Sequence, residues 1–558
     1  MHPRRRLLKR IGAGLGLVGS SVLLSKITPP IYAQTTPIEI EPGSFVETAD
    51  YIVFEKDGEY YAKNGRTGEV EFGPSDDASQ VIQNALNTLI DVGGKVFIKK
   101  AEYPLSNAID ISGISNLELA FERGCLLYPS DDAPSDTTLI ESADSDQENV
   151  KIHGATIDMR RDAGFTKIPL HFGGAGIKEF IEVYDMIFKN CPDAGIWTNG
   201  GAVEESNFRW SHIHDIVFVN CYRGYNSTGI RGVVIENLFG IEIDREFVFP
   251  SGNPNYTRKY ASDCRIRNIF VVNSEPKETL VVDATRSARM VIENVFGYNV
   301  LKLVNAEPFY DTESGQPPDH NIVRNLYGIN VARCAIKVTY GEGTRIENVV
   351  VENVSSDGQL PYAIGRNIVN AIIKGCRIKN AYARAIMLGA DSRNCVIVDN
   401  YIENCGLGGD NTEAIYLYRA TGIRIERNTI IDTQDTPTTT YGIYLDGSPE
   451  DYIIKGNIIS GMATGAIYRT GTGIIKDNIG YVTENAGVAT FSGDGSATQF
   501  TIPHGLVAEP EVVNVTPLSA DAAGDFYVTK DADNIYVNYL TAPPSGTDNV
   551  VLAWRAEV

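Results

Sequence analysis

Carboxylate side chains recur in one part of the chain at a spacing that could bring them together. Glu242 and Asp244 lie in the segment GIEID, and Asp283 ends the segment TLVVD. Both segments have the pattern of a short strand in which alternate side chains face solvent. If such strands stack in register, Asp244 and Asp283 occupy equivalent positions on neighbouring coils, while Glu242 and Lys302 share the adjacent exposed position. We therefore predict these four residues as the candidate catalytic group.

Two kinds of chemistry suit this group, and a third interpretation needs none. Carboxylates about 5 Å apart can act as acid and base, or acid and nucleophile, in glycoside hydrolysis. They could instead hold Ca²⁺ against a uronate while a Lys or Arg takes up the proton, as in a lyase. With Arg245, Arg286 and Lys337 close in the pattern, the group could also be a surface salt-bridge network. Structural roles are expected for His171, His212 and His214.

Aromatic residues recur at the same strand position elsewhere in the chain. The segments AIYLY, GIYLD and AIYRT place tyrosines at exposed positions, and GIWTN places a tryptophan at an earlier one. Exposed aromatic rings form a surface on which sugar rings stack. The alternative is a structural tyrosine ladder that packs coil on coil. The residues predicted to contact substrate are Trp197, Lys337, Arg245, Arg286, Tyr416, Tyr418, Tyr444 and Tyr468.

These strands must be positioned by a repeating framework. Between about Val150 and Tyr481 the chain repeats apolar residues that alternate into an asparagine, as in VIENLFGIE and IERNTIID. A period of about 20 to 30 residues is typical of a solenoid. Its β-branched strands and glycine turns favour a parallel β-helix. The repeated asparagine is expected to adopt αL geometry and to stack its amide on the coils above and below. Its copies are Asn237, Asn268, Asn294, Asn325, Asn348, Asn400, Asn428, Asn457 and Asn478.

The two ends of the chain depart from the repeat. A hairpin pattern precedes Asp76-Asp77, which begin an amphipathic helix that ends at Gly93-Gly94 and caps the first coil. The apolar face of this helix comprises Val81, Ile82, Ala85, Leu86, Leu89 and Ile90. We predict an all-β protein in four parts. These are an export signal at 1–35, a β-hairpin region at 36–75, a parallel β-helix with its capping helix at 76–486, and a small antiparallel β-sandwich at 487–558.

Charge and the N-terminal sequence restrict location and partners. A formal net charge of −22 disfavours nucleic acid and anionic lipid as partners. The run RRRLLK before a short apolar stretch has the form of a twin-arginine export signal, and the stretch is short for a membrane span. We therefore expect a secreted or cell-surface protein that keeps no membrane span after signal removal.

Two segments carry a resemblance to known proteins. The segment SDDASQVIQNALNTLIDVGGKVFIKKAEYPL, with the asparagine-bearing coils, resembles the pectate-lyase-like superfamily of right-handed parallel β-helices over roughly residues 75–481. The C-terminal segment FSGDGSATQFTIPHGL and the ending WRAEV are similar to modules of phage tail-fibre and archaeal surface proteins. This superfamily includes lyases, hydrolases, epimerases, tailspikes and proteins without known activity, so the resemblance implies the fold and leaves the reaction open.

Three functional interpretations follow from these observations. The first is a lyase or hydrolase that cleaves an acidic polysaccharide on the β-helix, with Ca²⁺ as a candidate cofactor. The second is a non-catalytic carbohydrate-binding or receptor-binding protein of the tailspike kind. The third is a purely structural surface protein. The C-terminal module is expected to mediate attachment or assembly, with a homotrimer as the candidate state.

Overall fold

The structure of the protein is a computed structural model that describes residues 49–199, 207–251, 261–306 and 320–558. The export signal predicted at 1–35 and the beginning of the predicted hairpin region lie outside the described residues. Within the described ranges, no helix has the length and apolar character needed to cross a membrane.

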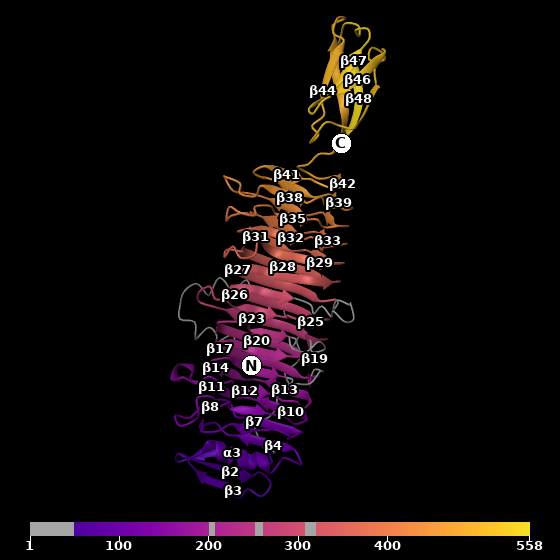
Figure 1. Ribbon diagram of the computed structural model, residues 1–558. Helices are drawn as coiled ribbons and strands as arrows, with labels where there is room; N and C mark the ends of the chain where they lie inside the picture. The colour runs from indigo at the N-terminus through magenta and orange to yellow at the C-terminus, as the bar shows by residue number, and fades with distance from the viewer. Residues whose placement is uncertain (1–48, 200–206, 252–260, 307–319) are drawn as a thin grey trace, which may run out of the picture. The chain divides into compact units, whose positions relative to one another are not determined.

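The strands of successive coils lie one above another (Figure 1), and their parallel pairings define three sheets. The first sheet contains β4 (Gly94–Ile98), β7 (Leu117–Phe121), β10 (Gln147–His153), β13 (Lys178–Tyr184), β17 (His212–Cys221), β20 (Val234–Ile243), β23 (Arg265–Val272), β26 (Val291–Ala306), β27 (Ile322–Glu342), β28 (Arg345–Val354), β30 (Ile372–Lys374), β33 (Val396–Val398), β36 (Arg424–Glu426), β39 (Tyr452–Lys455) and β42 (Gly473–Lys476). The longer strands β17 to β28 continue into the second sheet, which also contains β5 (Glu102–Leu105), β8 (Leu126–Pro129), β11 (Thr156–Asp158), β14 (Ile187–Lys189), β31 (Arg377–Ala381), β34 (Tyr401–Glu403), β37 (Thr429–Ile431) and β40 (Ile458–Ser460).

The third sheet is the one that carries most of the predicted site residues. It includes the last parts of β26 and β27 together with β6 (Ile109–Asp110), β9 (Ile140–Ser142), β12 (Leu170–Phe172), β15 (Ala194–Asn199), β18 (Arg223–Thr228), β21 (Val248–Ser251), β24 (Leu280–Asp283), β29 (Tyr362–Val369), β32 (Arg384–Leu388), β35 (Ile415–Tyr418), β38 (Tyr441–Asp446) and β41 (Gly465–Tyr468). A short additional row is formed by β16 (Phe208–Arg209), β19 (Ile230–Arg231), β22 (Ala261–Ser262) and β25 (Ser287–Ala288).

The interior of the coils is filled by apolar side chains that repeat at one position. On the third sheet, Ile336, Ile364 and Ile386 pair in register from coil to coil, and Ile415 and Ile443 continue the row. All five are fully buried. Burying one such side chain contributes about 1.5–3 kcal/mol, so each coil is stabilised mainly by the coils on either side of it.

The first coil is covered by the N-terminal elements. The strands β1 (Tyr51–Lys56), β2 (Glu59–Asn64) and β3 (Val70–Ser75) are antiparallel, and β1 also pairs in parallel with β4. The helix α3 (Ala78–Asn87) is capped at its N-terminus by Asp77, whose side chain accepts hydrogen bonds from the backbone N–H groups of Ser79 and Gln80. The helix ends at Asn87 rather than at Gly93, and the predicted apolar face is buried except for Ile90, which is 47% exposed.

The C-terminal residues form a separate β-sandwich. One sheet pairs β43 (Glu484–Gly493), β48 (Gly546–Glu557) and β45 (Val512–Pro517), and the other pairs β44 (Gln499–Pro503), β47 (Asn534–Tyr539) and β46 (Phe526–Lys530). Both sheets are antiparallel and enclose their own hydrophobic cluster, which includes Ile535, Val537 and Leu552. The predicted all-β fold class, with a parallel β-helix and a terminal sandwich, is confirmed.

The asparagine row expected from sequence is two rows with different roles. From Asn237 to Asn348 the repeated asparagine has φ between 56° and 58° and lies in the turn after the first sheet. Each amide donates from Nδ2 to the side-chain oxygen of the coil before, at 2.9–3.2 Å. The αL and stacking prediction is confirmed for this row.

The later asparagines point into the core instead. Asn400, Asn428, Asn457 and Asn478 are at most 6% exposed, and the residue before each of them holds the positive φ. The Nδ2 groups of the first three donate to the Oδ1 of the next coil at 2.9–3.0 Å. The αL prediction is therefore wrong for these four residues. Their amides face inward, where they bond to one another and to backbone groups of the adjacent coil.

The inner row should be more important for stability than the outer one. Asn428→Ala removes an amide that serves Asn400, Asn457 and the backbone, so it should lower the free energy of unfolding by about 2–4 kcal/mol. Asn294→Gly is the matched control, because Asn294 is exposed and glycine tolerates its φ of 58°, so the loss should stay below about 1 kcal/mol. Denaturant unfolding followed by circular dichroism measures both, and equal losses would contradict this distinction.

The C-terminal sandwich should fold independently, because its core is separate from that of the β-helix. A chain that ends at Thr483 should keep a cooperative melting transition and the β-sheet circular dichroism of the coils. Light scattering of the full and shortened chains tests the homotrimer prediction, in which only the full chain has the mass of three copies. Unfolding of the shortened chain would show that the module is an essential cap.

Candidate functional site

One outward position of the third sheet forms a continuous column of side chains. Strand pairing aligns these residues from coil to coil, with Asp283 between Phe249 and Asn305. The column contains, in order, Glu141, His171, Trp197, Asn226, Phe249, Asp283, Asn305, Lys337, Gly365, Met387, Tyr416, Tyr444 and Tyr468. We call it the site column. Because it is carried by strands rather than loops, its side chains are held in fixed relative positions.

Asp283 is the carboxylate whose environment is most unusual in this column. It is only 8% exposed, and its Oδ1 accepts hydrogen bonds from Thr285 Oγ1 at 2.6 Å and Asn305 Nδ2 at 2.9 Å. Burial raises the pKa of Asp283, and the nearby charge of Glu246 adds to the effect, whereas the two hydrogen bonds and Lys302 act in the opposite direction. A carboxyl group with a raised pKa is suited to proton donation.

Among the residues that the structure describes, several buried polar atoms on this face have no hydrogen-bond partner. They are Trp197 Nε1, Asn226 Oδ1 and Asn305 Oδ1 in the site column, and Thr339 Oγ1 two residues after Lys337. Asn226 and Asn305 are each only 6% exposed. An unpaired buried polar group costs about 1–3 kcal/mol. Hydroxyl groups of a bound ligand could pair with these donors and acceptors.

Glu246 is a functional candidate that the sequence did not reveal. It lies in the turn before β21, and its Oε2 accepts a hydrogen bond from Arg223 Nε at 2.7 Å. The same guanidinium contacts Asp193 at 2.8 Å, so Glu246 is held in place. No strand pattern marks a residue in such a turn. Only its proximity in space to Asp283 identifies it.

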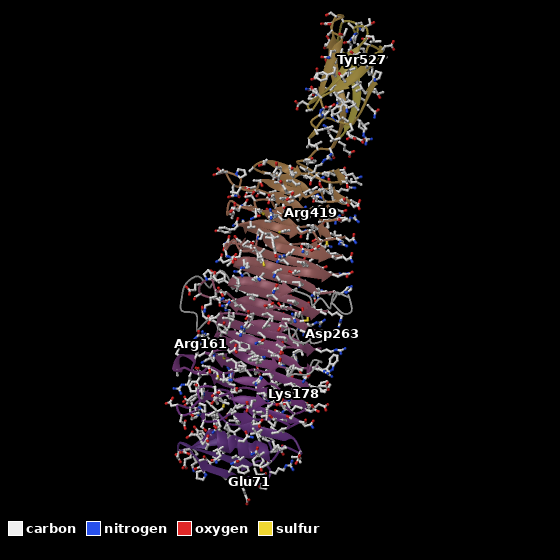
Figure 2. The ribbon with its side chains drawn as sticks, viewed as in Figure 1. Glu71, Arg161, Lys178, Asp263, Arg419 and Tyr527 are labelled. Carbon is white, nitrogen blue, oxygen red and sulfur yellow. The ribbon has the colours of Figure 1, made fainter. Side chains whose placement is uncertain are left out.

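The predicted shared column of Asp244 and Asp283 is wrong. GIEID is not a third-sheet strand, because β20 runs on to Ile243 and pairs with β23 in the second sheet. Asp244 is paired with Arg161, labelled in Figure 2, at 2.8 Å and with Lys277 at 3.0 Å. Partial burial raises the pKa of Asp244. The hydrogen bonds and charges of these two cations outweigh that effect, so the pKa of Asp244 is lowered. Glu242 has a φ of 55° and contacts Lys277 at 3.1 Å.

The predicted basic residues are dispersed. Lys302 is buried in β26 opposite Leu280 rather than in the site column. Arg245 is paired with Glu278, and Arg286 has a φ of 56° in the turn after β24. Lys337 alone is confirmed in the column, beside Asn305. The predicted catalytic and binding residues therefore fall into two groups. One is Asp283 with its neighbours in the site column, and the other is an ion-pair network around Asp244.

The predicted tyrosine surface is a stacked ladder. The Tyr416 ring lies between the Arg384 guanidinium, 3.6 Å from its centroid, and the Tyr444 ring at 5.8 Å. Tyr444 is stacked on its other face by Tyr468 at 4.5 Å. The faces of Tyr416 and Tyr444 are thus covered, as in the structural alternative, and Tyr468 remains 39% exposed. Tyr418 lies beside Arg419, whose guanidinium is 5.1 Å from its ring.

The residues expected to hold Ca²⁺ do not fit that ion. Both oxygens of Asp244 bond to cationic side chains, and Glu242 contacts Lys277 and the backbone N–H of Ser274. Ca²⁺ requires six to eight oxygen ligands. Among the described residues, one group of three His, Cys, Asp or Glu side chains is close enough to hold a metal ion, and it lies on the first sheet.

The comparison with known proteins agrees with this architecture. Residues 317–496 match a family described as "Right handed beta helix region". The chain is a right-handed parallel β-helix protein. No curated protein matches it significantly.

Two solved structures are similar to this chain at low sequence identity. The A-module of a mannuronan C-5 epimerase from Azotobacter vinelandii is 15% identical, with 72% of this chain and 95% of the other covered and a TM-score of 0.36. The tailspike protein of E. coli bacteriophage HK620, solved with a pentasaccharide, is 12% identical, with 88% and 92% covered and a TM-score of 0.48.

Neutralising Asp283 should stabilise this β-helix at neutral pH. Asp283→Asn keeps the Oδ1 acceptor for Thr285 and Asn305 but removes a buried charge. Because the folded-state pKa of Asp283 is raised, its ionisation costs stability as pH rises from the unfolded to the folded pKa. The melting temperature of the variant should therefore be about 1–2 °C above that of the wild type at neutral pH. In acid the two melting temperatures should be equal. A lower melting temperature at neutral pH would contradict the assignment.

Proposed function

We propose that the protein binds a polysaccharide along the outer face of the third sheet and cleaves it with Asp283 as proton donor. The observation that carries the proposal is a buried carboxyl group with a raised pKa in a column whose neighbours have unpartnered polar atoms. Sites with perturbed titratable groups and convergent polar groups are characteristic of binding and catalysis.

In this proposal Asp283 protonates the leaving glycosidic oxygen. That step is shared by hydrolysis and β-elimination, because in both reactions the oxygen leaves with the electron pair of the broken bond. In hydrolysis, the carboxylate of Glu246 takes a proton from the attacking water. In β-elimination no water is consumed. A basic side chain takes the proton from the carbon next to the uronate carboxyl group, and the electron pair of that C–H bond forms the new double bond.

The basic residues favour an acidic polysaccharide as substrate. The protein carries a formal net charge of −22, so an anionic chain must meet a local group of cations. Lys337 lies in the site column one coil beyond Asn305, and Arg286 follows Asp283 in the turn after β24. In the proposal these two residues bind uronate carboxylates on either side of the cleaved bond.

A non-catalytic receptor-binding protein is the second candidate. The unpartnered polar atoms of Trp197, Asn226 and Asn305 would bind sugar hydroxyls whether or not cleavage follows. Both candidates act outside the cytoplasm, which agrees with the proposed export signal at 1–35.

The test is a screen of the purified protein against uronate and neutral polysaccharides. We expect new reducing ends from the wild type and at least an about 100-fold lower rate from Asp283→Asn, because general acid catalysis contributes that much or more. Activity should fall as pH rises through the raised pKa of Asp283, since the protonated form is the donor. Reducing-end assays measure cleavage, and ultraviolet absorbance detects the unsaturated product of elimination.

Two further variants refine the outcome. Asp399→Asn is the control, because Asp399 has a φ of 56°, which asparagine tolerates, and it pairs with exposed Arg427 outside the site column. It should keep wild-type activity. Glu246→Gln should inactivate a hydrolase and spare a lyase. Full activity in Asp283→Asn would overturn the proposal, and binding without cleavage by the wild type would establish the receptor-binding alternative.

A further inference from the structure

Two histidines and a glutamate meet on the first sheet, away from the site column. Glu182 on β13 and His212 on β17 pair directly across the sheet, and His214 follows two residues later on the same face. One potential ligand atom from each of the three residues lies within 4.8 Å of the other two. No partner of these histidines can be recognised in the sequence, because only the register between coils brings the three residues together.

The hydrogen bonds of His214 leave one of its nitrogens facing a carboxylate. His214 Nδ1 is 2.8 Å from Asp215 Oδ2, and donation of its N–H there leaves the lone pair on Nε2. Nε2 lies 3.3 Å from Glu182 Oε1. Either a proton on Nε2 or a metal ion between the two atoms makes this contact attractive. A carboxylate that orients a histidine in this way is also typical of metal sites.

His212 has a matching arrangement. Its Nε2 is 3.0 Å from Glu236 Oε1, so donation to this carboxylate leaves its second nitrogen as a potential ligand. The His212 and His214 rings are stacked, with centroids 3.9 Å apart. Two imidazolium rings stacked this closely would repel one another. Because an imidazole binds a metal ion in its own ring plane, the two rings must turn out of this stack to share one ion.

We propose that Glu182, His212 and His214 bind a Zn²⁺ ion on the first sheet, with a fourth position open to solvent. Two ligands about 2.0–2.1 Å from a tetrahedral Zn²⁺ lie about 3.3–3.4 Å apart, which matches the separation of His214 Nε2 and Glu182 Oε1. Imidazole nitrogen and carboxylate oxygen are ordinary zinc ligands. The His212 and His214 side chains are 37% and 15% exposed, so the ion can enter from solvent.

The test uses the full chain without a histidine tag, freed of metal with a chelator. Titration calorimetry with Zn²⁺ should show one site of micromolar or tighter affinity, and Co²⁺ should give the visible absorption bands of a tetrahedral site. His212→Gln, His214→Gln and Glu182→Gln should each weaken binding at least about ten-fold. Asp215→Asn, which keeps the side-chain shape, should weaken it about ten-fold by releasing His214.

His153→Gln is the matched control. His153 lies two coils before His214 in the same row of the first sheet. It is stacked on Tyr184 at 4.5 Å and contacts Glu118 instead of the proposed ligands. This variant should bind Zn²⁺ like the wild type. Absence of Zn²⁺ binding and Co²⁺ bands in the wild type would overturn the proposal and leave a protonated His214 between two carboxylates. Unchanged affinity in all three ligand variants would also overturn it, and the wild-type spectrum decides the question should a variant fail to fold.

Discussion

Register between neighbouring coils is the constraint on which the rest of this structure depends. Each coil bonds to the coil before and the coil after it, so a side chain meets the same position of its neighbours. The inner amides from Asn400 to Asn478 make this requirement strict, because they find their partners inside the core only when the coils are aligned. A slip of one residue would turn the inward amides and isoleucines of a coil outward and leave the amides of its neighbours buried and unpaired.

The same register creates both proposed sites. On the third sheet it places a buried carboxyl group, two amides and an indole in one column, and on the first sheet it brings Glu182 against the histidines of the next coil. Strands hold these groups, so little reorganisation is needed when a ligand binds. The burial that gives Asp283 its raised pKa also costs stability, which is common where a fold carries function.

The fold could be predicted from sequence because it depends on local patterns. Alternating apolar residues, the recurring asparagine and the cap at Asp77 determine the strands, the turns and the helix wherever they occur. The site depended on turn lengths, which these patterns do not contain. GIEID resembles a third-sheet strand, yet the true counterpart of TLVVD is the segment at Val248–Ser251, whose phenylalanine and proline hide the alternation. Asp244 was therefore misplaced, and Asn226, Glu246 and Asn305 were missed.

The two asparagine rows also align the dipoles of their side-chain amides. In the outer row each amide donates to the coil before it, whereas in the inner row each amide donates to the coil after it. Aligned amide dipoles polarise one another, most strongly in the low dielectric of the core. The inner row is therefore a short chain of aligned dipoles opposed in sense to the outer row. A coil inserted into either row would need an asparagine whose amide donates in the same direction as the other amides of that row.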